Sequence, residues 1–127
     1  MSFIDSYRKS WALRCLREAK VNMMEARERK GVASLPLIAS AIKKAQTAIY
    51  YGLGDPSLID PIIRSYLGHP AKVGDPILHF LVGIESTLSS LATPAPLEGV
   101  NVMGKAEGII TATDRMIKLI LKEAAGS

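Results

Sequence analysis

The sequence is poor in the residues that build metal sites and disulfide bonds. Its 127 residues include one cysteine, Cys15, and two histidines, His69 and His79. A lone cysteine cannot form an internal disulfide, which fits a reducing compartment, and we expect Cys15 to be a small buried side chain. Two histidines and one cysteine are too few for a closed zinc site, and the Glu-x-x-His pairs of a di-iron bundle are missing. We therefore expect no metal and no cofactor.

Long apolar runs are also missing. No uninterrupted apolar stretch approaches the ~20 residues that cross a bilayer, and no basic-then-apolar leader opens the chain, so we expect a cytoplasmic protein without a membrane segment. Neither a phosphate-cradling Gly-Lys-Ser or Gly-Lys-Thr nor a nucleophile elbow is present, which leaves acyl transfer unsupported. Amide side chains are limited to Asn22, Asn101 and Gln46, a shortage that favours a thermophilic source.

What the chain does contain is helical periodicity. Hydrophobic residues make up 48% and charged residues 22%, as in globular proteins, and the length suits a single domain over residues 1–127. Apolar residues recur every three or four positions in five segments, at about 5–30, 34–51, 56–67, 76–92 and 102–124, and no segment alternates as a strand would. The predicted fold is all-α: an antiparallel up-and-down helical bundle of four long helices plus one short helix.

Capping residues mark where these helices should begin. Ser2 and Asp5 are spaced as a capping box for the first helix, and Ser34 is a favourable N-cap for the second. Three Asp-Pro pairs each suit an N-cap followed by a first helical residue, namely Asp55-Pro56, Asp60-Pro61 and Asp75-Pro76.

The first helix carries most of the positive charge. Eight basic residues and three acidic ones lie between Tyr7 and Lys30, whereas the rest of the chain is about neutral. An anionic partner such as RNA would therefore meet this helix, and its candidate contacts are Arg14, Arg17 and Lys20. The alternative is an ordinary solvated face.

The same helix carries apolar residues on the side away from its predicted core face. Leu13, Val21 and Met24 lie there among the basic residues. A second line of exposed apolar residues is uncommon on the surface of a monomer. We therefore expect a subunit interface and a homodimer.

Arg64 and His69 form the only pair with a chemical interpretation. If the third helix ends at Gly68, the turn could bring His69 back beside Arg64. A histidine that titrates near neutrality can take the proton from a ribose 2′-hydroxyl, and a guanidinium can stabilise charge on the attacked phosphate without a metal. The alternative is an exposed helix end, with His69 near the last carbonyls of the helix.

The chain resembles the HEPN family, the higher eukaryotes and prokaryotes nucleotide-binding domain. Residues 11–19 (WALRCLREA) look like the long first helix of that family, residues 38–51 (IASAIKKAQTAIYY) look like its second, and the last predicted helix resembles its closing one. Ribonuclease members carry Arg, then four to six residues, then His. Many of them have Asn, Asp or His directly after the Arg, where this chain has Ser65.

The resemblance implies a helical bundle that binds a nucleotide or RNA and functions in a toxin–antitoxin or RNA-processing system. It implies that Arg64 binds phosphate and His69 acts as base, in a dimer whose two motifs face one cleft, and it allows a nucleotidyltransferase partner. We add Ser65, Tyr66 and His79 as candidate binding residues, with side-chain packing as the alternative for Tyr66 and His79. The competing hypothesis for the whole chain is a non-catalytic helical dimer or partner-binding module.

Overall fold

The described part of the chain consists of helices joined by short turns. The structure, a computed structural model, describes residues 6–29, 31–67, 74–92 and 99–126, and these contain no strand. This confirms the all-α prediction. None of the helices in these ranges is long and apolar enough to cross a membrane. The helices are α1 (Ser6–Arg29), α2 (Leu35–Leu53), α3 (Pro56–Ser65), α4 (Pro76–Ala92) and α5 (Gly99–Gly126), with a 3-10 turn, η1 (Gly31–Ser34), before α2.

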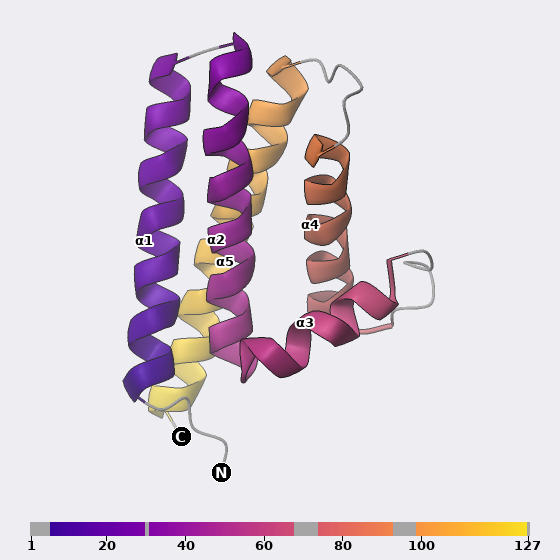
Figure 1. Cartoon of the computed structure of the whole chain (residues 1–127). Coiled ribbons are helices and arrows are strands. Elements are labelled where there is room, and N and C mark those ends of the chain that lie inside the picture. The colour runs from indigo at the N-terminus through magenta and orange to yellow at the C-terminus, as the bar shows by residue number, and fades with distance from the viewer. Residues whose placement is uncertain (1–5, 30, 68–73, 93–98, 127) are drawn as a thin grey trace.

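The long helices lie alongside one another, with α2 in a central position. Figure 1 shows α1 at one edge, α2 and α5 beside it, and α4 on the other side of α2. The short α3 runs across the end of the group, from the end of α2 towards the start of α4, and contacts both. This crossing brings side chains of α2, α3 and α4 together at one end of the molecule.

The core is built by the apolar lines that the periodicity predicts. Small residues line the contact between α1 and α2, where Ala12, Ala19 and Ala26 face a helix that buries Ala41 and Ala45, so the two backbones can approach closely. Larger side chains fill the remaining space between the helices; those fully enclosed include Ile38, Ile42, Ile49, Ile63, Leu81, Ile84 and Ile117. Burial of side chains of this size is the main stabilising contribution to such a domain.

Two of the predicted caps are present in the structure. The Asp55 carboxylate accepts hydrogen bonds from the backbone N–H of Ser57 at 2.9 Å and from its hydroxyl at 2.8 Å, at the start of α3. Asp75 accepts from the backbone N–H groups of Ile77 at 2.8 Å and Leu78 at 3.1 Å, at the start of α4. Each carboxylate satisfies amide donors that the first turn of a helix leaves unpaired.

The other predicted starts need correction. Ser34 has helical backbone angles and makes no side-chain cap, because η1 leads directly into α2. The Asp60-Pro61 pair lies inside α3 and begins no helix. Ser2 and Asp5 lie outside the described residues.

Helix ends also differ by two or three residues from the prediction. α2 continues to Leu53, where the N–H of Gly54 bonds to the carbonyl of Tyr50 at 2.9 Å, and α3 ends at Ser65 rather than Leu67. α5 begins at Gly99, three residues before the predicted start, and ends at Gly126. Glycine and proline therefore mark these ends only approximately.

Candidate functional site

Arg64 lies in the last turn of α3, between two carboxylates. Its Nε donates a hydrogen bond of 2.8 Å to Oδ2 of Asp60, one turn earlier on the same helix. Its Nη2 lies 3.5 Å from Oε1 of Glu85 on α4. The side chain nevertheless keeps 54% of its surface exposed. Two contacts on different helices thus fix the plane of the guanidinium, while part of it faces solvent.

Glu85 is a buried carboxylate with a buried partner. Only 7% of its side chain is exposed, and its Oε2 accepts a hydrogen bond of 2.6 Å from the Nε2 amide of Gln46, which is fully buried on α2. Lys43 donates to the Oε1 of Gln46 at 3.2 Å. A carboxylate held away from water needs such donors, because an unpaired buried charge is costly.

Tyr50 completes the group from the α2 side. Its hydroxyl donates a long hydrogen bond of 3.4 Å to Oδ1 of Asp60. Burial raises the pKa of Tyr50, and the negative charges of Asp60 and Glu85 raise it further. The phenol therefore stays protonated and acts as a donor at neutral pH. We call the six linked residues the Arg64 network: Lys43, Gln46, Tyr50, Asp60, Arg64 and Glu85.

The charges of the Arg64 network balance. Lys43 and Arg64 are positive, and Asp60 and Glu85 are negative. The hydrogen bond to Asp60, with the charges of Glu85 and Asp60, raises the pKa of Arg64. Like any guanidinium, Arg64 stays charged at all relevant pH values. A guanidinium has five N–H donors, of which these two contacts use a part. The remaining N–H groups of Arg64 can donate hydrogen bonds to a molecule bound from solvent.

The residues around Arg64 that the sequence singled out have different environments. His69 lies outside the described residues, so its distance to Arg64 stays a prediction. The hydroxyl of Ser65 donates to the carbonyl of Ile62 at 2.6 Å, within its own helix. Tyr66 is half-buried against the core. The Ser65 hydroxyl is thus used locally, and Tyr66 has a packing role.

His79 is exposed at the edge of a shallow hollow beside the end of α3. The hollow measures about 130 Å³ and is lined also by Leu67, Val82, Gly83 and Ser86. Val82 is buried, whereas Gly83 and Ser86 are exposed. His79 is therefore an exposed side chain, and its role in binding or in packing stays a prediction.

Three residues of the Arg64 network were not predicted as site residues, although their spacing in the sequence indicates them: Gln46, Asp60 and Glu85. Gln46 follows Ile42 by four residues and Glu85 follows Leu81 by four, so each polar residue falls on the apolar line of its helix. Asp60 and Arg64 are also four apart, the spacing of a helical ion pair. Polar residues at core positions indicate a buried network, but their partners could not be read from the chain.

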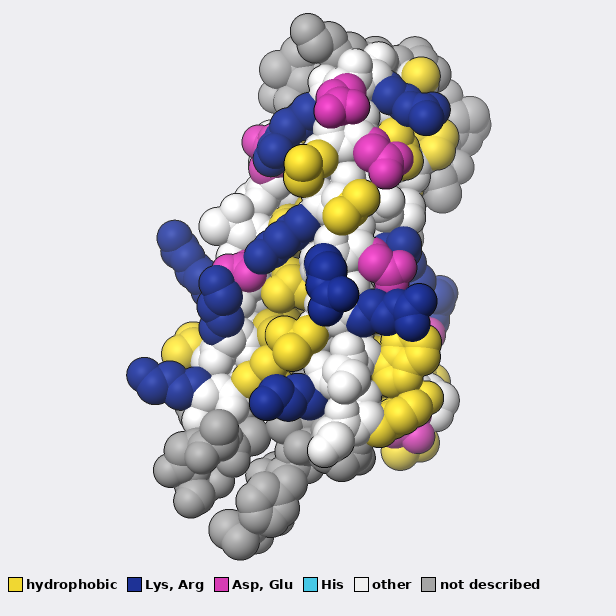
Figure 2. All heavy atoms as spheres, turned by 90° about the vertical axis from the view of Figure 1, so that its left-hand side faces the viewer, with side chains coloured by type: hydrophobic (Ala, Val, Ile, Leu, Met, Phe, Trp, Pro, Cys, Tyr) yellow, Lys and Arg dark blue, Asp and Glu magenta, His cyan; other side chains and the backbone are white. Residues whose placement is uncertain are grey.

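The basic face of α1 is partly neutralised by contacts within the chain. Nε of Arg14 lies 3.5 Å from Oε1 of Glu18, and Cζ of Arg14 lies 5.0 Å from the centre of the Trp11 ring. Nζ of Lys20 lies 2.7 Å from Oδ1 of Asp114 on α5. Arg17 is exposed and makes no ion pair within the described ranges. Figure 2 shows Lys and Arg side chains gathered on this face, with hydrophobic side chains between them.

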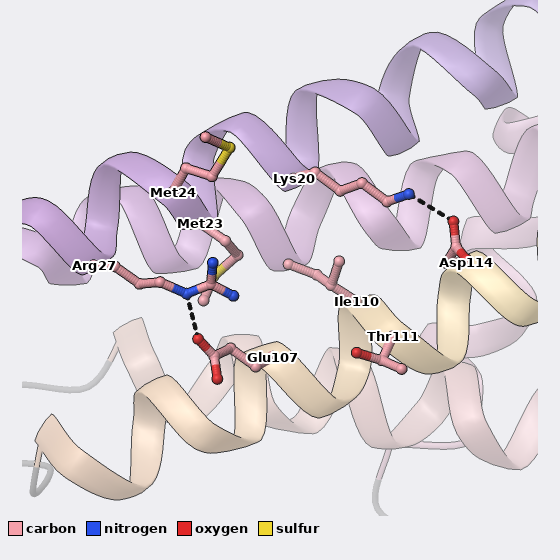
Figure 3. Close-up of a pocket in the computed structure, with 8 residues that line it drawn as sticks. All are labelled: Lys20, Met23, Met24, Arg27, Glu107, Ile110, Thr111 and Asp114. Atoms are coloured by element: carbon pink, nitrogen blue, oxygen red, sulfur yellow. Dashed lines mark hydrogen bonds and ion pairs between the residues drawn. The ribbon is translucent and has the colours of Figure 1, made fainter.

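Beside this face, a groove of about 440 Å³ runs between α1 and α5. Figure 3 shows its two cross-links: Arg27 to Glu107 at 2.5 Å, and Lys20 to Asp114 at 2.7 Å. Hydrogen bonds from Lys20 and Lys118 lower the pKa of Asp114. Both ion pairs join α1 to α5, so they bridge the groove at two points.

The residues predicted as a dimer interface lie away from the core. Leu13 is 36% exposed, Val21 46% and Met24 58%. Met24 follows Met23, which is 2% exposed and points towards α5 (Figure 3). These exposures agree with the predicted second apolar line on α1.

Two further observations concern metal ligands and related proteins. Among the residues that the structure describes, no three His, Cys, Asp or Glu side chains are grouped to hold a metal ion. Comparison of the chain with protein-family models, curated proteins and solved structures finds no match.

Proposed function

We propose that the protein is a HEPN-like RNA-binding protein that cleaves RNA without a metal, with Arg64 binding the phosphate and His69 acting as base. The observation that carries this proposal is the state of Arg64. Its charge is permanent, its plane is fixed by Asp60 and Glu85, and about half of its side chain is open to solvent. A fixed cation with free donors is what recognition of a phosphate oxygen requires.

The chemistry needs only these two side chains and the ribose. His69 takes the proton of the 2′-hydroxyl, the 2′ oxygen forms a bond to phosphorus, and the bond from phosphorus to the 5′ oxygen breaks. The leaving 5′ oxygen takes up a proton from solvent water, and the protonated His69 returns its proton to the solvent afterwards. Arg64 stabilises the extra negative charge on the phosphate oxygens during this step.

The proposal includes the finer architecture and assembly expected from the sequence. We take the helices as an antiparallel up-and-down bundle of four long helices plus one short helix, in a single domain. The protein forms a homodimer in the cytoplasm, where a reducing environment suits the single buried thiol of Cys15.

Cleavage of single-stranded RNA in the presence of EDTA tests this function. We expect activity to fall at least about a hundredfold in both Arg64→Ala and His69→Ala, the range for loss of one acid–base or charge-stabilising group. Arg115→Ala, which removes an exposed arginine of α5, is the matched control and should cleave normally. Circular dichroism of each variant separates loss of activity from loss of fold. Undiminished cleavage in either site variant would overturn the assignment.

A second candidate is a non-catalytic module that binds a nucleotide, an RNA or a nucleotidyltransferase partner. One observation favours it: both contacts of Arg64 are carboxylates, so the ion is compensated within the chain and links α3 to α4. Under this candidate, Arg64→Ala destabilises the fold and no RNA is cut by the parent protein. Calorimetry with single-stranded RNA and with ATP tests the RNA and nucleotide ligands. A pull-down from cell lysate, searched for a nucleotidyltransferase, tests the protein partner.

A further inference from the structure

The outer surface of α1 carries one continuous line of exposed residues. Ser10, Arg14, Arg17, Val21, Met24 and Glu28 are all exposed and follow one another at spacings of four, three, four, three and four. This alternation keeps the line straight along a helix and is the spacing of residues that meet a second helix in a coiled coil. The opposite side of α1 is buried by α2 and α5.

The chemistry of this line changes along its length. Arg14 and Arg17 are basic, Val21 and Met24 are apolar, and Glu28 is acidic. RNA would use Arg14 and Arg17 of this line but would gain nothing from its apolar part or from Glu28, although Arg27 and Arg29 flank Glu28 on the same helix. A second α1 helix running in the opposite direction matches all three parts, because basic then faces acidic and apolar faces apolar.

We propose that α1 pairs in antiparallel orientation with α1 of a second copy, about a two-fold axis between Val21 and Met24. In this register Val21 packs against Met24 of the second copy, and Arg17 lies opposite its Glu28. Because the pairing is two-fold symmetric, each of these contacts occurs twice in the dimer. A parallel pairing would instead place Arg17 against Arg17 and Glu28 against Glu28, which is repulsive.

Most charges beside the line permit the approach of a second α1. Arg29, next to Glu28, is exposed and remains as one positive charge that the described contacts do not compensate. Lys20 and Arg27 are already paired with Asp114 and Glu107 of their own α5, so they add little repulsion between two copies. Arg14 is held by Glu18. Arg17 and Glu28 make no ion pair within the described part of the chain and are available to each other.

This pairing specifies the contact of the proposed homodimer but does not rest on the proposed RNA cleavage. α3 begins near the first turn of α1 but runs away from it towards α4, so its last turn, which carries Arg64, lies on the α4 side of the molecule (Figure 1). The two Arg64 networks would therefore remain apart in such a dimer, unlike a dimer in which two motifs share a cleft. Loss of dimerisation through α1 and loss of RNA cleavage can therefore be measured separately.

Sedimentation equilibrium of the full chain over a range of concentrations tests the pairing. A single-helix contact buries less than a standard interface, so we expect a dissociation constant on the order of micromolar. Arg17→Glu should raise it about tenfold, because two attractive contacts become repulsive. Glu28→Arg should do the same, and the double variant Arg17→Glu/Glu28→Arg should restore dimerisation.

Two further variants separate the apolar centre from general surface effects. Val21→Asp should leave only monomer. Leu58→Asp, at a leucine that is 68% exposed on α3, should dimerise like the parent chain. Circular dichroism checks that each variant stays helical.

Three results would overturn the proposal. They are a parent chain that is monomeric at all concentrations, dimerisation that does not respond to Arg17→Glu, and a double variant that fails to recover. A monomeric parent whose affinity for single-stranded RNA falls on Arg17→Glu would instead assign this face to RNA.

Discussion

The Nε2 amide of Gln46 on α2 donates a hydrogen bond of 2.6 Å to Oε2 of Glu85 on α4, and both residues are buried. The other oxygen of Glu85 faces Arg64 at the end of α3. One buried carboxylate therefore connects three consecutive helices, α2, α3 and α4. Glu85, which Gln46 holds, and Asp60 together fix Arg64, which links the stability of the fold to the geometry of the candidate site.

Gln46→Leu should destabilise the protein by about 1–3 kcal/mol, because Glu85 loses a donor that buried charge requires. Urea unfolding measures the change. Gln46→Leu/Glu85→Leu replaces both partners by apolar groups, and we expect it to cost less than the sum of the single substitutions. Additive costs would mean that the two side chains act independently.

Adjacent isoleucines on α3 offer a matched comparison. Ile63 is fully buried and Ile62 is 49% exposed. Ile63→Ala should lower the free energy of unfolding by about 2–5 kcal/mol through lost burial and the cavity left behind. Ile62→Ala should change it by less than about 1 kcal/mol, because this side chain is half in water already. Equal effects in urea unfolding would contradict the packing of α3.

The Lys20–Asp114 contact should make stability depend on acid pH. The folded pKa of Asp114 is lowered, so its contribution is fully present above the unfolded value and is lost as pH falls through the folded one. Asp114→Asn should therefore be less stable than the parent near neutrality and match it more closely at acid pH, as the Asp114 carboxylate becomes protonated in the folded protein. Denaturant midpoints across this range provide the measurement.

Glu25→Gln is the control for Asp114→Asn, since Glu25 is exposed and makes no ion pair within the described residues. It should show no such pH dependence. A difference between Asp114→Asn and the parent that stays constant with pH would remove charge as the cause.

Cys15 should react slowly with a thiol reagent while the protein is folded. The residue is buried, and burial raises the pKa of its thiol, with the charge of Glu18 adding to the effect. Both reduce the amount of accessible thiolate, which is the reactive form. Unfolding in urea should restore the rate of a free cysteine. Fast modification of the native chain would place Cys15 at the surface.

Local information in the sequence determined most of the secondary structure. Apolar spacing of three and four residues is enough to identify a helix and its buried side, so the core lines of α1, α2, α4 and α5 are readable. Asp55 and Asp75 cap their helices through contacts within three residues, which a sequence can also reveal. Asp60-Pro61 carries the same dipeptide and caps nothing, because a helix already surrounds it.

Tertiary structure alone decided which residues surround Arg64. The sequence identified Arg64 and linked it to His69, five positions away, but the described contacts of its guanidinium are Asp60 and Glu85. Glu85 follows Arg64 by 21 positions, and Gln46 precedes Glu85 by 39. Periodicity places such residues on a buried face but does not say which faces meet. That pairing follows from how α3 crosses between α2 and α4, which depends on packing across the whole domain.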